Sequence, residues 1–183
     1  MNDHPGDFLF CLREDLRRYR AVIHGQATGK AWPALFSPRF APVLLYRLAF
    51  AFEGCGLGFV AKIFSLCNFV IFGIEIADRC PIGPGFVLPH TQGTVIGASR
   101  VGTNVTIFQG VTLGARELDI AYNTESRPFI GDGVIIGAGA KVLGGVRLGD
   151  YSRVGANAVV LESVPAGALA AGVPARFILS KQP

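Results

Sequence analysis

Between residues 130 and 165, an aliphatic side chain returns at every sixth position. The repeated positions are Ile130, Ile136, Val142, Leu148, Val154 and Val160. A period of six matches neither the 3.6-residue turn of an α-helix nor the two-residue alternation of a plain strand. Gly or Leu follows each aliphatic residue, and small residues fill much of each hexad. This internal repeat predicts a β-solenoid, in which three hexads of about eighteen residues in all form one triangular coil.

The same period extends toward the N-terminus with two interruptions. Aliphatic anchors fall at Ile76, Ile82 and Leu88, and the pattern then slips by one residue to Val95, Val101, Ile107 and Leu113. We expect a bulge at 90–93, where the slip occurs. A polar stretch at 115–128 separates Leu113 from the uninterrupted hexads. We expect this stretch to be a loop extruded from the solenoid, and such loops commonly hold functional residues.

The predicted fold is therefore mainly β. We expect a left-handed parallel β-helix over 75–165, an N-terminal α-helical region over 1–74 and a short C-terminal segment over 166–183. Left-handed coiling is a known exception to the right-handed crossover preference.

The N-terminal region predicts three main helices. Asp7 can cap the first, whose apolar face would hold Leu9, Leu12, Leu16 and Tyr19, with the charged residues of 13–18 on the opposite side. Further helices are expected over 42–53 and 57–72. Lys62 is the single charged residue in 54–74, but Asn68 and the early glycines argue against a membrane span. We expect this segment to cap the solenoid, and leave open subunit contact or peripheral contact with the inner face of the membrane.

Composition restricts the functional classes. Half of the 183 residues are hydrophobic and 16% are charged, which suits stacked coils and oligomer faces. The net charge of +4 comes without a basic stripe interleaved with aromatic residues, so a nucleic-acid partner is not expected. No secretory signal is expected at the N-terminus, which predicts a cytoplasmic protein.

The metal-binding and disulfide patterns are also absent from the sequence. Cys11, Cys55, Cys67 and Cys80 show no C-x-x-C spacing, and His90 is the single histidine within the solenoid segment. We therefore expect packed thiols, no disulfide framework and no metal.

Several segments resemble the hexapeptide-repeat acyltransferases. Within that superfamily, the chain is similar to the serine acetyltransferases and to the related O-acetyltransferases of exopolysaccharide and capsule pathways. The matching segments are 12–17, 45–49, 73–76, 111–114, 136–141 and the ending 171–176. The resemblance implies an acetyltransferase with acetyl-CoA as co-substrate. It also implies a homotrimer, or a dimer of trimers, with active sites between the solenoids of neighbouring subunits.

His90 is the predicted general base. It lies in the register slip and at the position of the catalytic histidine of the resembling enzymes. Histidine titrates near neutral pH, so it can take a proton from an attacking hydroxyl. No Ser or Cys stands beside it, so we expect direct attack without an acyl-enzyme.

Glu75 is the predicted partner of this base. It lies fifteen positions before His90, where the family has an acidic residue. We expect it to stack near Thr94, at the corner of His90, and to orient the imidazole. The alternative is a structural role at the junction between helix and solenoid.

Small residues at the turns are the predicted binding surface for the co-substrate. Gly114, Ala115, Ala138 and Ala156 would let a pantetheine arm approach the backbone, although such turns are also expected for structural reasons alone. Lys141 and Arg176 are candidates for contacts with its phosphates.

The acceptor site departs from the serine enzymes. They carry an Asp-His pair at the base and an Arg-His pair late in the loop, whereas this chain has Pro89-His90 and Ser126-Arg127. The missing Asp removes the obvious partner of an ammonium group. We therefore predict a sugar hydroxyl of a surface polysaccharide or its precursor as acceptor, with Gln92, Gln109 and Arg127 as binding candidates. The alternatives are L-serine, as in cysteine biosynthesis, and a noncatalytic trimeric scaffold.

Overall fold

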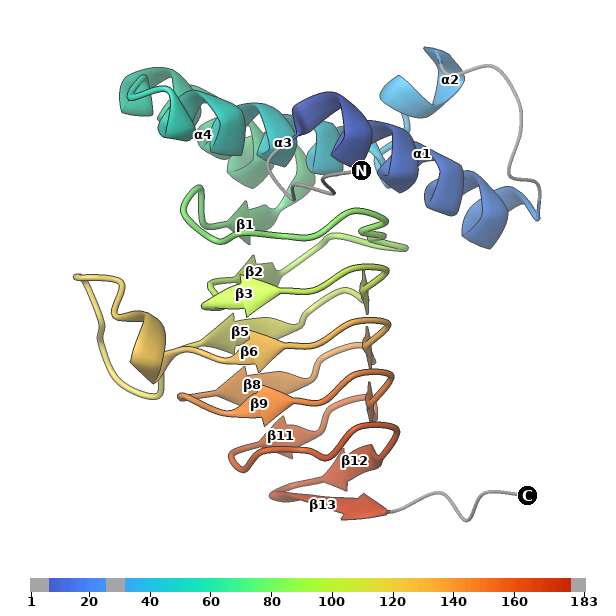
Figure 1. Ribbon diagram of the computed structural model, residues 1–183, viewed down its shortest axis with the longest axis vertical. Coiled ribbons are helices and arrows are strands. Elements are labelled where there is room, and N and C mark those ends of the chain that lie inside the picture. Colours follow the sequence, from blue (N-terminus) through green and yellow to red (C-terminus); the bar gives the residue numbers. More distant parts are fainter. Residues whose placement is uncertain (1–6, 26–31, 179–183) are drawn as a thin grey trace.

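A cap of helices lies above a column of short strands in the computed structural model, which describes residues 7–25 and 32–178 (Figure 1). The helices of the cap are α1 (Phe8–His24), α2 (Trp32–Leu35), α3 (Ala41–Gly54) and α4 (Gly58–Phe72). The parallel β-solenoid expected from the hexads and the helical region expected before it are both confirmed.

The first helix begins where the sequence predicts, but its buried face differs. The carboxylate of Asp7 accepts hydrogen bonds from the N–H groups of Leu9 and Phe10, at 3.0 and 3.3 Å. The residues of α1 that are fully buried are Cys11, Asp15 and Tyr19. Leu9 is 59% exposed. The expected apolar stripe is therefore partly wrong, because α1 docks on the solenoid through a polar contact.

That polar contact joins α1, α3 and the first coil. Arg47 of α3 donates to the carboxylate of Asp15 at 2.8 Å, and to the carbonyl oxygens of Ile82 and Gly83 at 2.5 and 2.7 Å. The same carboxylate accepts a hydrogen bond from the N–H of Phe86 at 2.8 Å. Because the Asp15 and Arg47 side chains are almost completely buried, the cap is held at a fixed position on the solenoid.

The fourth helix leaves much of its apolar surface uncovered. Phe59, Leu66 and Val70 are 81%, 60% and 70% exposed. Within residues 7–25 and 32–178, no helix has both the length and the apolarity needed to cross a bilayer.

The solenoid consists of three sheets, to each of which successive coils add a strand (Figure 1). The first sheet contains β1 (Ile74–Ile76), β2 (Thr94–Ile96), β5 (Thr112–Gly114), β8 (Lys141–Leu143) and β11 (Val159–Val160). The second contains β3 (Arg100–Val101), β6 (Phe129–Ile130) and β9 (Arg147–Leu148). The third contains β4 (Thr106–Ile107), β7 (Ile135–Ile136), β10 (Arg153–Val154), β12 (Leu169–Gly172) and β13 (Ala175–Ile178).

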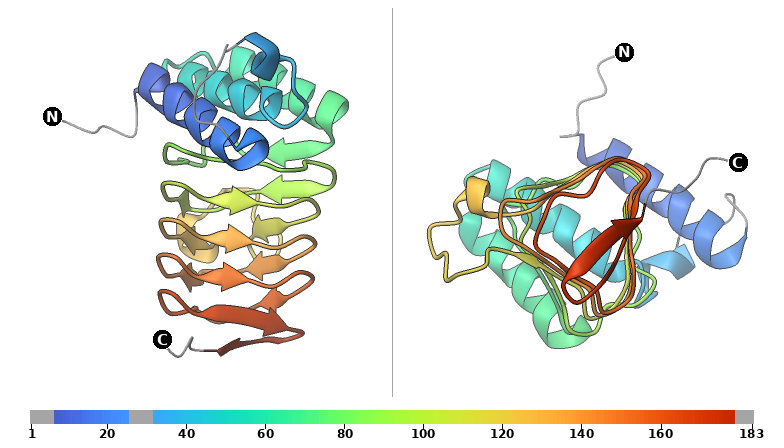
Figure 2. Two further views of the ribbon diagram at one scale, coloured as in Figure 1. Left: turned by 90° about the vertical axis from the view of Figure 1, so that its right-hand side faces the viewer. Right: turned by 90° about the horizontal axis from the view of Figure 1, so that it is seen from below.

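Within this column only β13 pairs antiparallel, which closes the described solenoid at its C-terminal end. Seen from below, the coils form a roughly triangular outline, and the segment between β5 and β6 projects from one corner (Figure 2). This segment corresponds to residues 115–128 and includes the short 3₁₀ helix Thr124–Ser126.

The register corrects the expected slip. Ile76 aligns with Ile96, and Ile96 aligns with Leu113, so Ile96 occupies the inner column in place of Val95. Ile96 is 1% exposed. The step from Leu88 is therefore two residues longer than a hexad, and the following step to Val101 is one residue shorter. Periodicity alone hides this compensation, since both Val95 and Ile96 are aliphatic.

Glycines after the aliphatic anchors have a steric cause. A Cβ built on Gly102 would lie 2.7 Å from the carbonyl carbon and oxygen of Gly131 in the next coil. Real Cβ atoms do not approach that closely, so the stacking of these two coils requires glycine at residue 102.

Candidate active site

His90 lies at the corner between the third and the first sheet. It follows the buried Leu88 and Pro89 and precedes β2, and its own side chain is exposed. The adjacent turn is tied to the end of the cap. Thr91 donates its hydroxyl hydrogen to the carbonyl of Phe72 at 3.0 Å, and the N–H of Gly93 donates to the carbonyl of Gly73 at 2.8 Å. The two extra residues therefore form an anchored turn that presents the imidazole to the outside.

A cavity of about 310 Å³ opens beside this imidazole. The solenoid and the connection between α2 and α3 both line it, through Ser37, Pro38, Arg39, Pro89, His90, Thr91 and Gln92. The cap thus supplies one wall of the site. Sequence reasoning missed Ser37 and Arg39, because no local pattern shows that a turn between two helices will lie over a histidine some fifty residues later.

A column of predicted binding residues continues from the His90 corner along the solenoid. Backbone hydrogen bonds between successive coils place Gln92, Gln109, Ala138 and Ala156 at equivalent positions of this corner. The bonds run from Gly110 N–H to Gln92 O at 3.0 Å, from Gly139 N–H to Gln109 O at 2.8 Å, and from Asn157 N–H to Ala138 O at 2.8 Å. Small side chains at the lower levels leave the backbone open to a long, thin ligand.

Two polar side chains belong to this column. Lys141 of β8 donates from Nζ to the carbonyl oxygen of Gly110 at 2.5 Å, so its ammonium group is held against the corner. The side-chain oxygen Oε1 of Gln109 is buried and accepts no hydrogen bond from any residue of the described ranges. A ligand or a neighbouring chain that donates a hydrogen bond would satisfy this oxygen.

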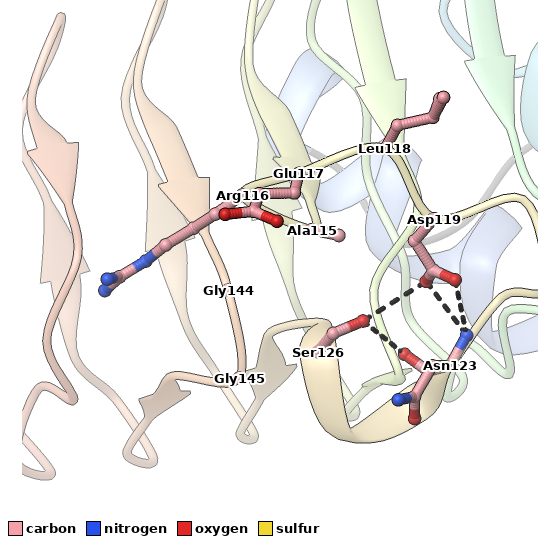
Figure 3. Close-up of a pocket in the computed structure, with 9 residues that line it drawn as sticks. All are labelled: Ala115, Arg116, Glu117, Leu118, Asp119, Asn123, Ser126, Gly144 and Gly145. Atoms are coloured by element: carbon pink, nitrogen blue, oxygen red, sulfur yellow. Dashed lines mark hydrogen bonds between the residues drawn. The ribbon is translucent and has the colours of Figure 1, made fainter.

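The extruded loop lies at a different corner, between the first and the second sheet. Its cavity of about 510 Å³ is shown in Figure 3. The residues that line it are Ala115, Arg116, Glu117, Leu118, Asp119, Asn123, Ser126, Gly144 and Gly145. Among the predicted co-substrate residues, Gly114 and Ala115 belong to this corner, whereas Ala138, Lys141 and Ala156 belong to the His90 corner. In a single chain the predicted residues therefore divide between two corners of one prism.

Arg127 clamps the loop in place. Its guanidinium donates to the carboxylate of Asp119 at 2.9 Å and to the carbonyl of Gly97 at 3.0 Å, and it lies 3.8 Å from the ring centroid of Tyr122. The pKa of Asp119 is lowered, chiefly because the backbone N–H of Asn123 donates to its carboxylate, with help from the Ser126 hydroxyl and Arg127. These contacts engage the cation within its own chain, so its role toward an acceptor stays a prediction.

Glu75 lies on β1 with its side chain exposed. The register pairs it with Val95, so the expected stacking over Thr94 is wrong by one residue, for the same reason as the slip. It makes no hydrogen bond with His90 among the residues that the structure describes. Its role in orienting the base stays a prediction.

Arg176 lies apart from the other candidates. It belongs to β13 at the C-terminal end of the third sheet, where it is exposed and donates to the carbonyl of Ala175 at 3.4 Å. Over residues 7–25 and 32–178, no cluster of three or more His, Cys, Asp or Glu side chains is suited to a metal ion.

Known proteins resemble both parts of this molecule. The bacterial transferase hexapeptide family, with six repeats, matches residues 127–162. The serine acetyltransferase of Helicobacter pylori strain J99 is 39% identical over 161 residues, which are 87% of this chain and 92% of that protein. The serine acetyltransferase of Mycobacterium tuberculosis strain H37Rv is 37% identical over 177 residues, which are 96% of this chain and 75% of the relative.

Solved structures give the same match in three dimensions. A serine acetyltransferase in complex with CoA superposes with a TM-score of 0.80 at 33% identity, covering 93% of this chain and 69% of that one. The Neisseria gonorrhoeae enzyme in complex with serine gives a TM-score of 0.79 at 29% identity, covering 92% and 68%. With more than nine-tenths of this chain superposed, the similarity extends beyond the solenoid into the helical cap.

Proposed function

This chain belongs to the serine acetyltransferase family, and from that membership we propose that it transfers an acetyl group from acetyl-CoA to the hydroxyl of L-serine. The expected class of enzyme, an acyltransferase with acetyl-CoA as co-substrate, is confirmed. The relatives support serine as acceptor better than they support the polysaccharide acceptor predicted from the sequence. One observation of the structure carries the proposal, namely the cavity beside His90 at the head of a column of small residues.

His90 is the proposed general base. The acceptor oxygen attacks the carbonyl carbon of the thioester while its proton passes to the imidazole. The carbon–sulfur bond then breaks, and the departing thiolate takes the same proton to become the free thiol. In our proposal Glu75 stabilises the imidazolium during this cycle. Because the imidazole is exposed at the cavity and hydrogen-bonded to no described residue, its nitrogen atoms are available for this task.

The His90 corner fits a pantetheine arm. Below Gln109 the column holds Ala138 and Ala156, whose small side chains would let a chain of methylene and amide groups lie along the backbone. We propose that Lys141 and Arg176 bind the phosphates of the co-substrate, and that Gly114 and Ala115 contact it from the loop corner.

We further propose that the β-helix is left-handed and that the chain forms a homotrimer, with each active site between the solenoids of two subunits. The division of the predicted residues between two corners of one chain supports this arrangement, because the His90 corner of one copy could face the loop corner of the next. In this scheme the helices before residue 75 cover the solenoid, residues 75–165 form the catalytic solenoid, and the segment from residue 166 to residue 178 ends it. Pairing of trimers, a cytoplasmic location and membrane contact stay predictions.

A sugar hydroxyl is the second candidate acceptor. The observation that favours it is the lack of any acidic side chain lining the His90 cavity, where Pro89 stands beside the base. A serine ammonium group therefore has no anionic partner in the cavity of a single chain.

The His90→Ala variant tests the proposal. We expect acetyl transfer to fall by about a hundredfold or more, while the circular dichroism spectrum and the oligomer size stay as in the wild type. His24→Ala is the matched control, because His24 is an exposed histidine at the end of α1 and does not line the cavity. Near wild-type turnover in His90→Ala would contradict the assignment.

An acceptor screen separates the candidates. Thiol release from acetyl-CoA is followed with L-serine, nucleotide sugars and oligosaccharides. Release with L-serine alone supports the first candidate, and release with a sugar alone supports the second. The noncatalytic scaffold predicts that calorimetry detects no saturable binding of acetyl-CoA.

A further inference from the structure

We propose that Arg39 binds an anionic group of the acceptor, so that the enzyme selects hydroxyl compounds that carry a carboxylate or a phosphate. This inference rests on the proposed function, because it places the anion in the cavity where His90 would act as base.

Arg39 shares its cavity with His90 although it belongs to the cap. It lies in the connection between α2 and α3, and both residues line the same space of about 310 Å³. Small-molecule sites commonly enclose about 300–1,000 Å³, so this space suits a small acceptor or a single sugar unit. An acceptor whose hydroxyl reaches the imidazole would therefore lie within reach of the guanidinium.

The guanidinium of Arg39 is free within the described residues. It makes no ion pair and no side-chain hydrogen bond there, and the residue is exposed. Three other arginines of the cap have structural partners. Arg17 pairs with Glu14 at 2.7 Å, Arg47 pairs with Asp15 at 2.8 Å, and Arg18 donates to the carbonyl of Gly85 at 2.6 Å. All of the guanidinium donors of Arg39 are thus left for a ligand.

The remaining polar groups of the cavity also favour an anion. The hydroxyl oxygen of Ser37 accepts hydrogen bonds from the Tyr19 hydroxyl at 2.9 Å and from the N–H of Arg39 at 3.3 Å, so its own hydrogen is left to donate. No Asp or Glu lines the cavity. The positive end of α3 begins two residues after Arg39, which adds to the favourable potential. A cationic group would instead meet an unpaired arginine.

Arg127 of the loop does not line the His90 cavity of its own chain and cannot bind an anion there. Arg127 is 12% exposed and paired with Asp119 at 2.9 Å, at the corner opposite His90 across the first sheet. An anion there would have to compete with the Asp119 carboxylate. The cap therefore provides an exposed cation in the same cavity as the predicted base.

Pairs of acceptors that differ in one anionic group test the role of Arg39. Steady-state kinetics compare L-serine with L-serinamide, and glucose 6-phosphate with glucose, for the wild type, Arg39→Gln and Arg39→Lys. The matched control is Arg13→Gln, which removes another exposed cap arginine that does not line the cavity. The first pair of acceptors reports on a carboxylate and the second on a phosphate.

We expect Arg39→Gln to raise the KM of the preferred charged acceptor by about tenfold or more, the usual cost of losing a charged hydrogen bond. The KM of acetyl-CoA, and kcat/KM for the analogue that lacks the anionic group, should stay within about twofold of the wild type. Arg39→Lys should recover most of the loss, because it keeps the charge. Equal behaviour of Arg39→Gln and Arg13→Gln would overturn the inference.

An equilibrium measurement separates this inference from the proposed function. Calorimetry titrates L-serine and glucose 6-phosphate into wild-type protein and Arg39→Gln, each saturated with CoA. Binding that depends on Arg39 without acetyl transfer would refute the proposed function alone. If acetyl transfer and acceptor binding are the same in Arg39→Gln as in the wild type, the inference alone is refuted.

Discussion

Single residues decide how the cap meets the solenoid. Asp15 and Arg47 come from two helices, and both bind the backbone of the first coil as well as each other. A buried ion pair gains stability only when its remaining donors and acceptors are satisfied. The carbonyls of Ile82 and Gly83 and the N–H of Phe86 meet that condition here. The helical pattern places Asp15 on the charged face of α1, so its burial could not be predicted without knowing its partners.

Removal of one partner should therefore be costly. We expect Arg47→Met to lower the free energy of unfolding by about 3–5 kcal/mol, because it leaves a carboxylate buried without a counter-charge. Urea denaturation followed by circular dichroism measures the change. The control is Arg17→Met. The side chains of Arg17 and Glu14 are 60% and 31% exposed, so their ion pair should contribute less than about 1 kcal/mol. Equal losses in the two variants would argue against a structural role for the buried pair.

At the scale of elements, the two interruptions of the repeat differ in how they are stabilised. The turn before β2 is held by hydrogen bonds to the backbone at the end of α4, from the hydroxyl of Thr91 to Phe72 and from the N–H of Gly93 to Gly73. The loop after β5 is held by its own side chains, since Asp119 accepts hydrogen bonds from the N–H of Asn123 and the hydroxyl of Ser126 (Figure 3). The guanidinium of Arg127 donates to the same carboxylate. The sequence located both interruptions, but the spacing of apolar residues says nothing about the carboxylate at the centre of the loop.

The loop should loosen in acid. The pKa of Asp119 in the folded protein lies below its ordinary value of 3.8, so its contribution to loop stability is complete above that value. The contribution is lost as the pH falls through the lowered pKa. NMR titration should show the amide signals of Asn123 and Ser126 shifting together below pH 3.8. Asp119→Asn should abolish this joint shift, and an unchanged titration in that variant would exclude Asp119 as its source.

At the scale of the whole molecule, the candidate site is distributed. The His90 cavity combines the cap with the first turn of the solenoid, whereas the loop cavity lies at another corner. Relatives that match more than nine-tenths of this chain support a common arrangement of cap and solenoid. A site shared between copies would bring the two corners together, because a cyclic trimer places unlike surfaces of neighbouring chains in contact.

Subunit mixing tests that arrangement. We expect His90→Ala and Arg127→Ala to be nearly inactive alone, the first for lack of a base and the second because the loop loses its clamp. In trimers mixed at random from equal amounts of both, about a quarter of the sites combine an intact histidine with an intact loop from the next chain. Co-expression with two affinity tags, followed by thiol-release assays, should therefore recover about a quarter of the wild-type activity. No recovery would mean that both parts of the site belong to one chain.

The sequence by itself determined the solenoid, its helical cap and the loop at 115–128, and it singled out His90 as the candidate base. These features depend on local repetition: each hexad must place an aliphatic residue inside the coil and a compact residue where successive coils approach, as at Gly102 and Gly131. Only the tertiary structure decided that Ile96 replaces Val95 in the core and that Arg39 lies beside His90. The physical reason is that these choices depend on contacts between distant segments, which leave no period in the chain. Arg39 and His90 share a cavity because Asp15 and Arg47 fix the cap on the first coil, and that restraint arises only when the chain is folded.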